Sequence, residues 1–230
     1  MLFPSRGWGM IKDESLSPDR VLGYLIFYEK SRTFYIELPD DADPWETPLL
    51  LSSFLDRGEH SIGSYWSHMW VQQRIVPPER QNIGQILKAA RLSEYNEFAL
   101  LLLNMGRCAQ DDCYLEEISA DDLPDELLKR WQEKVEDVVP VSGRRLLVFF
   151  RNGEVKVYEA LRLAEKMMAF IPILASDDMF NRVEVQPDGY GVMWGERLTV
   201  SDHTLYQEGS PVPLSRGAGE GPAPGGYPLR

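Results

Sequence analysis

The chain has 230 residues, of which 43% are hydrophobic and 26% charged, and its 36 acids against 24 Lys and Arg give a formal net charge of −12 at pH 7. This composition is typical of a globular protein with one large or two small domains. The acidic balance argues against direct binding to nucleic acid or to an anionic membrane, because both depend on clustered Lys and Arg. No apolar run approaches the roughly 18 residues of a membrane span and the start lacks a signal-peptide pattern, so we expect a cytoplasmic protein.

The N-terminal region predicts a small sheet followed by helices. Two apolar runs, residues 21–28 and 33–38, flank a short polar stretch and fit a β-hairpin. Residues 60–74 predict an amphipathic helix whose apolar stripe, at i, i+3, i+4 spacing, runs from Ile62 to Gln73. Two further helices are expected over 79–90 and 93–105, with Ser93 as the N-cap and Gly106 as the C-cap of the second.

Trp66 and Trp70 lie one helical turn apart in the amphipathic helix and leave two alternatives open. Large aromatic side chains at helical spacing normally face a domain core. If this face is partly exposed instead, the pair would serve a protein interface, where Trp is enriched. For that case the candidate partner-binding residues of this region are Trp66, Trp70, Arg74 and Pro78.

Several short motifs follow one another over residues 21–118: Leu22-Gly-Tyr-Leu25, Phe34-Tyr-Ile36, Pro48-Leu-Leu-Leu-Ser52, Ile75-Val-Pro-Pro78 and Asn104-Met-Gly-Arg107. Their order resembles the small N-terminal subdomain of HipA-type toxin kinases. The resemblance implies a non-catalytic module that packs on a kinase core, takes part in complexes with an antitoxin or, in split systems, restrains the kinase as a separate chain. The sequence shows no Gly-rich phosphate loop and no catalytic-loop motif of the kinase itself.

Residues 119–140 predict a connecting helix, whose acidic first turn suits the helix dipole. The charge is unevenly distributed around it. Residues 1–118 carry 18 acids and 11 bases, residues 119–140 carry 7 and 3, and residues 141–230 carry 11 and 10. We therefore expect the first half and its connecting helix to favour a basic protein surface, with salt-sensitive association.

Residues 141–210 predict a second small domain of β-β-α-β-β order. Strands over 145–150 and 154–158 are joined through Asn152-Gly153, a strong hairpin signal. A helical segment over 161–175 is expected to kink or end early at Pro172, strands follow over 180–186 and 191–194, and Ser201 caps a short helix over 202–207. Tyr190 and Trp194 are the candidate partner-binding residues of this domain.

Three motifs of this second region are Phe149-Phe-Arg-Asn-Gly153, a run from Phe180 to Val185, and Gly189-Tyr-Gly-Val-Met-Trp-Gly195. Over about residues 141–209 they are similar to a small bacterial family, domain of unknown function 2442. Members of that family often accompany toxin–antitoxin or regulatory genes. From residue 211 the chain is rich in Gly and Pro, which predicts a disordered tail.

No catalytic, cofactor or metal site is predicted. Cys108 and Cys113 form one pair of thiols, whereas zinc sites normally need four ligands, so structural thiols are expected. His60, His68 and the paired acids are interpreted as satisfied or solvated groups. Adjacent Ser201, Asp202 and His203 contain the letters of a catalytic triad, but triad members converge from separate elements.

The sequence therefore predicts an α+β protein with a domain over 1–118, a connecting helix over 119–140, a domain over 141–210 and a tail over 211–230. The predicted function is that of a non-enzymatic, antitoxin-like or accessory subunit that binds a separately encoded HipA-like serine/threonine kinase of a bacterial toxin–antitoxin system. One alternative is an enzyme with a carboxylate-based site, which a deep cleft gathering acids from both domains would favour. The other is a structural scaffold.

Overall fold

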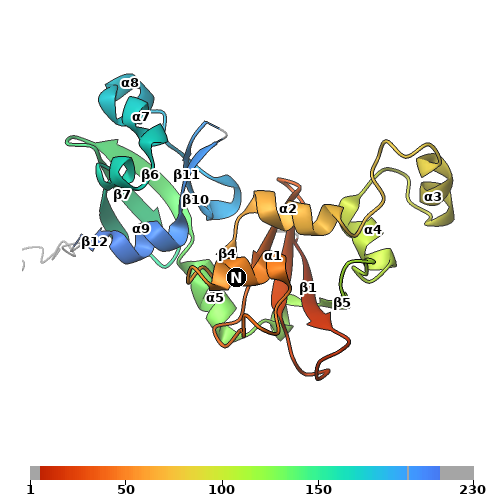
Figure 1. The fold of residues 1–230 in the computed structure, drawn as a ribbon. Helices are drawn as coiled ribbons and strands as arrows, with labels where there is room; N and C mark the ends of the chain where they lie inside the picture. The colour runs from red at the N-terminus through yellow and green to blue at the C-terminus, as the bar shows by residue number, and fades with distance from the viewer. Residues whose placement is uncertain (1–5, 196, 213–230) are drawn as a thin grey trace, which may run out of the picture.

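The computed structural model describes residues 6–195 and 197–212, and it has the α+β class that the sequence predicts (Figure 1). Two halves lie side by side, each built on antiparallel sheet with helices packed against it. Within the described residues, no helix is long and apolar enough to cross a membrane. The predicted tail from residue 213 onward lies outside the described residues, whereas Ser210–Pro211 form a short strand, β12.

The N-terminal half contains a five-stranded antiparallel sheet of order β4-β3-β2-β1-β5. The predicted hairpin is confirmed, because β2 and β3 pair from Tyr24↔Glu37 to Tyr28↔Thr33. The strands of this sheet are β1 (Arg6–Asp13), β2 (Gly23–Tyr28), β3 (Thr33–Glu37), β4 (Ser61–Ile62) and β5 (Cys113–Ile118).

Strand β1 was not predicted, although it lies inside the sheet between β2 and β5. The glycines of β1 explain why its sequence lacks the usual strand pattern. A Cβ atom on Gly7 would lie 2.2 Å from the Phe98 ring, and one on Gly9 would lie 2.7 Å from Leu115. Neighbouring side chains therefore fill the space beside this strand, and the resulting glycine alternation hides the usual strand pattern.

Both faces of the sheet are covered, so every residue of β2 is buried. One face, which includes Leu25, Phe27 and Ile36, packs against the helices of this half. The opposite face, which includes Ile26 and Tyr35, packs against the connecting helix and the second half. The alternation of side chains along β2 and β3 thus divides them between two separate cores.

Four helices belong to this half: α1 (Leu49–Leu55), α2 (Ser64–Gln72), α3 (Ile83–Ala89) and α4 (Glu97–Leu103). The predicted face of α2 is wrong by about one residue, because Ser67, Trp70 and Val71 are the buried residues. The ends of α4 also differ. Asn96, and not Ser93, caps its start by accepting a hydrogen bond from the Ala99 N–H.

The C-terminal end of α4 has the paired hydrogen bonds of a Schellman motif. The Met105 N–H donates to Leu102 O and the Gly106 N–H donates to Leu101 O. Met105 takes the left-handed position with φ 54°, one residue before the predicted Gly106, which also has a positive φ of 65°. The predicted site of termination is therefore correct to one residue.

The observed helix between the two halves is shorter than the predicted connecting helix over residues 119–140. A short 3₁₀ helix, η1 (Ala120–Asp122), precedes α5 (Asp125–Gln132), and Val135–Val141 form strand β6. Val135 and Val138 are buried along β6, which pairs with β7. The second half therefore begins near Val135, since β-branched residues here extend the sheet rather than the helix.

The C-terminal half contains a four-stranded sheet of order β12-β8-β7-β6 and a three-stranded sheet of order β11-β10-β9. The Asn152-Gly153 hairpin is confirmed between β7 and β8. The further strands are β7 (Arg145–Phe150), β8 (Val155–Glu159), β9 (Glu184–Val185), β10 (Gly191–Trp194) and β11 (Leu198–Ser201).

The helical segment after β8 is broken as expected, with Pro172 in the first turn of α7. The predicted strand over 180–186 is reduced to Glu184–Val185, because Phe180 ends helix α8. Ser201 caps α9 as predicted, by accepting from the Thr204 N–H. The elements are α6 (Arg162–Lys166), η2 (Met168–Phe170), α7 (Ile171–Ala175), α8 (Asp177–Phe180), η3 (Pro187–Gly189) and α9 (Asp202–Glu208).

Candidate functional site

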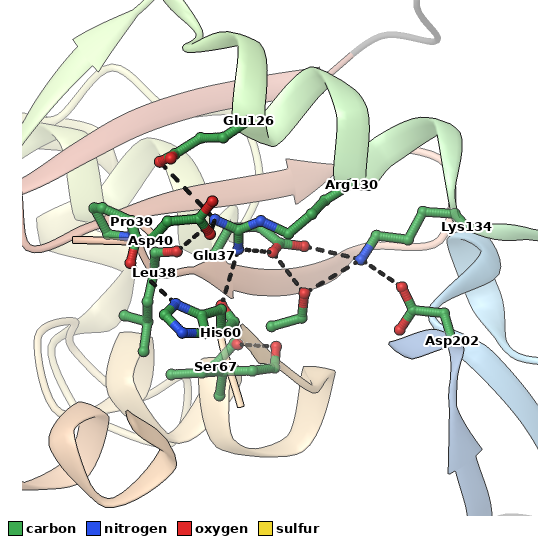
Figure 2. Close-up of polar contacts among 12 residues, drawn as sticks. Glu37, Leu38, Pro39, Asp40, His60, Ser67, Glu126, Arg130, Lys134 and Asp202 are labelled. Carbon is green, nitrogen blue, oxygen red and sulfur yellow. Dashed lines mark hydrogen bonds and ion pairs between the residues drawn. The ribbon is translucent and has the colours of Figure 1, made fainter. Parts of the chain in front are cut away.

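Four charged side chains from three regions of the chain meet where the two halves join (Figure 2). Glu37 ends β3 of the first half, Arg130 lies on α5, Lys134 follows α5, and Asp202 begins α9 of the second half. We call these four residues the junction cluster. Because these three regions lie far apart in the sequence, the cluster exists only when both halves are folded against each other.

Lys134 is the centre of the junction cluster, and its side chain is only 1% exposed. Its Nζ atom lies 3.0 Å from Glu37 Oε1 and 2.8 Å from Asp202 Oδ2, and it stands 3.8 Å from the centre of the Tyr190 ring. Burial acts to lower the pKa of Lys134, but the Asp202 and Glu37 carboxylates outweigh it and hold the pKa above its usual value. Lys134 is therefore a fixed cation.

Glu37 receives two cations and a hydroxyl group. Arg130 Nη1 lies 3.0 Å from Glu37 Oε2, and Ser61 Oγ donates to the same oxygen over 2.6 Å. Burial acts to raise the pKa of Glu37, but Lys134 and Arg130 outweigh it and hold the pKa below its usual value. Neither Glu37 nor Lys134 is therefore poised to exchange a proton near neutral pH, and the cluster serves to hold the two halves in one arrangement.

Tyr190 extends the junction into an aromatic stack. Its ring lies parallel to that of Tyr35, with centroids 3.5 Å apart, and edge-on to that of Tyr28. The Tyr35 hydroxyl donates to Pro187 O over 2.8 Å, and Asp188 accepts from the hydroxyl of Thr33. These contacts join β3 to the loop before β10, beside the charged cluster.

A cleft of about 470 Å³ lies between the halves, next to the junction cluster. Asp40 and Glu59 line it from the first half, Glu126 and Glu133 from the α5 region, and Asp202 from the second half. His60 also lines the cleft, and its Nδ1 lies 3.0 Å from Pro39 O. Since a carbonyl oxygen only accepts, Nδ1 carries a proton that fixes the ring.

A separate feature of the first half is a shallow hollow of about 390 Å³, which we call the Trp45 hollow. Trp45 is 96% exposed and Leu49 is 86% exposed. On the neighbouring part of α1, Phe54 contacts Trp66 edge-on, with ring centroids 6.3 Å apart. The hollow is lined by Pro44, Trp45, Thr47, Leu49, Ser52 and Asp56.

The predicted partner-binding residues of the first half divide into two groups. Trp66 is 45% exposed and Pro78 is exposed, so both remain candidates for a surface contact. Trp70 and Arg74 are buried, and a partner does not reach them. The Arg74 guanidinium stacks on the Trp70 ring at 3.8 Å, donates to Trp70 O and pairs with Asp111. Trp70 is thus a core residue and Trp66 is not.

The two predicted residues of the second half are also buried. Trp194 packs against Phe170 and Phe180, and its Nε1 donates to Phe180 O over 2.9 Å. Tyr190 contacts the first half of the same chain rather than the surface. The prediction that these two side chains contact a partner at the surface is therefore wrong, because Trp194 faces the core of the second half and Tyr190 faces the first half.

The remaining candidates have local structural roles. Cys113 is buried, which raises the pKa of its thiol to about 12, and Cys108 is half-buried. His68 lies 2.9 Å from a Glu97 carboxylate oxygen. In the run 201–203, Ser201 caps α9 and Asp202 pairs with Lys134, so the triad letters do not form a triad. Among the described residues, no group of three or more His, Cys, Asp or Glu side chains is arranged to hold a metal ion.

The sequence did not reveal the residues that the structure brings into prominence. Glu37 and Lys134 are 97 positions apart, and Lys134 and Asp202 are 68 apart, so no local spacing connects them. Trp45 was not among the predicted partner-binding residues, although it lies in an acidic, Pro-containing loop, a composition that is typical of an exposed segment.

Comparison of the chain with family models, curated proteins and solved structures found no match.

Proposed function

We propose that this chain is a non-enzymatic interaction protein of the cytoplasm. The observation that carries the proposal is the Trp45 hollow, in which a 96% exposed Trp and an 86% exposed Leu border a depression. Exposed large apolar groups beside a hollow are typical of protein interaction sites, and Trp is a frequent centre of binding energy in such sites. The hollow lies on the first half, and its lining includes none of the four residues of the junction cluster.

The charge around the Trp45 hollow indicates the kind of surface that it meets. Asp43 and Glu46 flank Trp45 in the sequence, and Asp56 lines the hollow. Residues 1–118 as a whole carry 18 acids against 11 bases. A partner with an apolar centre and a basic rim complements this surface, and salt is expected to slow its association.

The partner that we propose is a separately encoded HipA-like serine/threonine kinase, with this chain as its antitoxin-like or accessory subunit. The motif order over residues 21–118 supports this choice, because it resembles the kinase subdomain that packs on the catalytic core. The chain would then dock on the kinase through the first half, and the second half would remain available for regulation or for a further partner.

The proposal is tested by co-expression of the full chain with a HipA-like kinase encoded beside its gene. We expect the two to co-purify and kinase toxicity to fall. Trp45→Ala should weaken binding about thirtyfold, which corresponds to the loss of an interface residue worth about 2 kcal/mol. Leu161→Ala is the control, since Leu161 is an exposed apolar residue on the second half. Failure to co-purify, or equal effects of the two variants, would contradict the proposal.

The cleft between the halves favours a second candidate, an enzyme with a carboxylate-based site. Carboxylates from both halves line it, as such a site requires, and His60 stands among them. Turnover of a substrate that Glu133→Gln abolishes without loss of folding would establish this candidate. Unchanged turnover in that variant would remove it.

A further inference from the structure

Two thiols lie at the loop that joins α4 to β5, on the side of the first half that faces away from the second half (Figure 1). Cys108 lies in this loop and is half-buried, whereas Cys113 begins β5 and is only 1% exposed. The linings of the cleft and of the Trp45 hollow include neither cysteine. The pair is therefore a feature that the proposed function does not use.

One carboxylate oxygen connects the two cysteines. Asp111 Oδ1 accepts from the Cys108 thiol over 3.5 Å and from the backbone N–H of Cys113 over 3.1 Å. The other oxygen of this carboxylate pairs with Arg74, whose side chain is fully buried. Asp111 thus fixes the loop against the core and holds Cys108 beside the first residue of β5.

The loop around Asp111 can adjust without repacking the core. Ala109, Gln110 and Asp112 are exposed, so the turn between the two cysteines is not packed against other side chains. Cys113 is fixed in the sheet by its pairing with Asp13. A disulfide requires Cα atoms about 4.4–6.8 Å apart. A movement of Cys108 past the Asp111 oxygen therefore suffices to bring the two sulfur atoms together.

The difference in burial gives the two thiols different reactivity. Burial, and after it the charge of the Asp111 carboxylate, raises the pKa of the Cys113 thiol to about 12, so Cys113 keeps its proton near neutral pH. Cys108 is the more accessible of the two and meets a dissolved oxidant first. Cysteines that react with oxidants are often placed beside a second cysteine that completes a disulfide. Cys113 has that position here.

We propose that Cys108 and Cys113 form a reversible disulfide on reaction with hydrogen peroxide, in which Cys108 reacts first and Cys113 completes the bond. In a cytoplasmic protein such a disulfide would be transient, because the cytosol returns thiols to the reduced state. This inference does not depend on the proposed kinase partner.

The reaction has two steps. Cys108 gives up its proton and its sulfur attacks one oxygen of the peroxide, so that an S–O bond forms, the O–O bond breaks, and the departing hydroxide takes up the proton and leaves as water. The Cys113 sulfur then attacks the Cys108 sulfur, an S–S bond forms, the S–O bond breaks, and hydroxide leaves as water with the Cys113 proton. Two thiols and one peroxide thus give one disulfide and two waters. We expect the second step to be the slower one, because Cys113 holds its proton.

The sequence around the pair allows a direct measurement. Trypsin cleaves after Arg107 and Lys129, and the peptide 108–129 between them contains both cysteines but no Met or Trp. Oxidation of Met or Trp elsewhere therefore leaves its mass unchanged. After the full chain is treated with hydrogen peroxide and its free thiols are blocked, we expect this peptide to be about 2 Da lighter than the reduced, unblocked peptide. Dithiothreitol added before the blocking step should abolish that loss.

Two variants separate the roles of the thiols. Cys113→Ala leaves the Cys108 sulfenic acid without a partner, so dimedone, which traps sulfenic acids, should label the peptide 108–129. Cys108→Ala leaves only the buried thiol, and we expect about tenfold less dimedone label. Circular dichroism checks that both variants fold, and Cys113→Val replaces Cys113→Ala if the smaller side chain prevents folding. The wild-type measurement depends on neither variant.

Three results would overturn the proposal. The first is that both wild-type thiols remain free after treatment with millimolar peroxide. The second is that the cysteines gain oxygen without becoming linked, or link two copies of the chain, because the pair would then not close within one loop. The third is equal dimedone labelling of Cys113→Ala and Cys108→Ala, because Cys108 would then not be the thiol that reacts first.

Discussion

Lys134 shows how a single buried side chain can join two halves of a protein. Two carboxylates that are themselves nearly fully buried, Glu37 and Asp202, depend on its charge. A buried ion pair contributes little net stability relative to apolar packing, but removal of one partner leaves an uncompensated charge. Loss of the Lys134 side chain would therefore destabilise the protein, because the Glu37 and Asp202 carboxylates would lose the cation that they share.

We predict that Lys134→Met lowers the free energy of unfolding by about 3–5 kcal/mol. The methionine has a similar length but leaves the Glu37 and Asp202 carboxylates without their shared cation. Urea denaturation of the full chain measures the change. Lys166→Met is the control, because Lys166 pairs with Glu208 at the exposed surface and such pairs are worth about 1 kcal/mol or less. Equal losses in the two variants would show that the buried cluster has no special role.

At the scale of elements, local signals determine which segments could be predicted. The Asn152-Gly153 turn and the Ser201 cap act within a few residues, and both were predicted correctly. Strand β1 was missed because Gly7 and Gly9 are required by side chains from distant segments. Strand β6 was missed because Val135 also fits the apolar stripe of the preceding helix, and only its pairing with β7 decides between the two.

Helix α4 offers a direct comparison of a predicted cap with the observed one. Asn96 Oδ1 accepts from the Ala99 N–H over 3.0 Å, whereas Ser93 precedes the helix and makes no cap. We predict that Asn96→Ala lowers the free energy of unfolding by about 1 kcal/mol, and that Ser93→Ala changes it by less than about 0.5 kcal/mol. Thermal unfolding of both variants checks this, and the reverse order of effects would show that the helix begins earlier.

For the whole molecule, the α+β class and the β2–β3 and β7–β8 hairpins could be predicted, but the candidate site could not. The spacing of apolar residues in the sequence indicates which side chains are buried, but it does not indicate which of the separate cores each side chain enters. Tyr190 and Trp194 were therefore placed on a surface, although Tyr190 packs against Tyr35 of the other half. The junction cluster and the cleft depend on how the halves meet, which no pattern within either half contains.

The contribution of the junction cluster to the pH dependence of stability follows from its two shifted groups. The pKa of Glu37 in the folded protein lies below its usual 4.5. The stability that the Glu37 carboxylate contributes is therefore fully present above pH 4.5 and is lost as the pH falls through the lower pKa of the folded state. The pKa of Lys134 lies above its usual 10.5, so its contribution is present below pH 10.5 and is lost as the pH rises through the higher folded value.

We therefore predict that the difference in unfolding free energy between the wild type and Glu37→Gln is nearly constant from about pH 5 to about pH 10. It should shrink below that interval, as Glu37 is protonated, and above it, as Lys134 loses its proton. Denaturant titrations at a series of pH values measure the difference. A difference that changes steadily across the neutral range would mean that other groups control the junction.

The shared cation of the junction also constrains how this protein can evolve. A mutation at Lys134 alone leaves the buried Asp202 carboxylate without its cation, and a mutation at Glu37 or Asp202 leaves Lys134 with one carboxylate in place of two. Tolerated changes at these positions are therefore expected to occur together. Two of them belong to different halves, and the third belongs to the segment between. Exchange of one half for that of a relative would therefore succeed only when the incoming half carries the matching charge, which makes the two halves a single unit of inheritance.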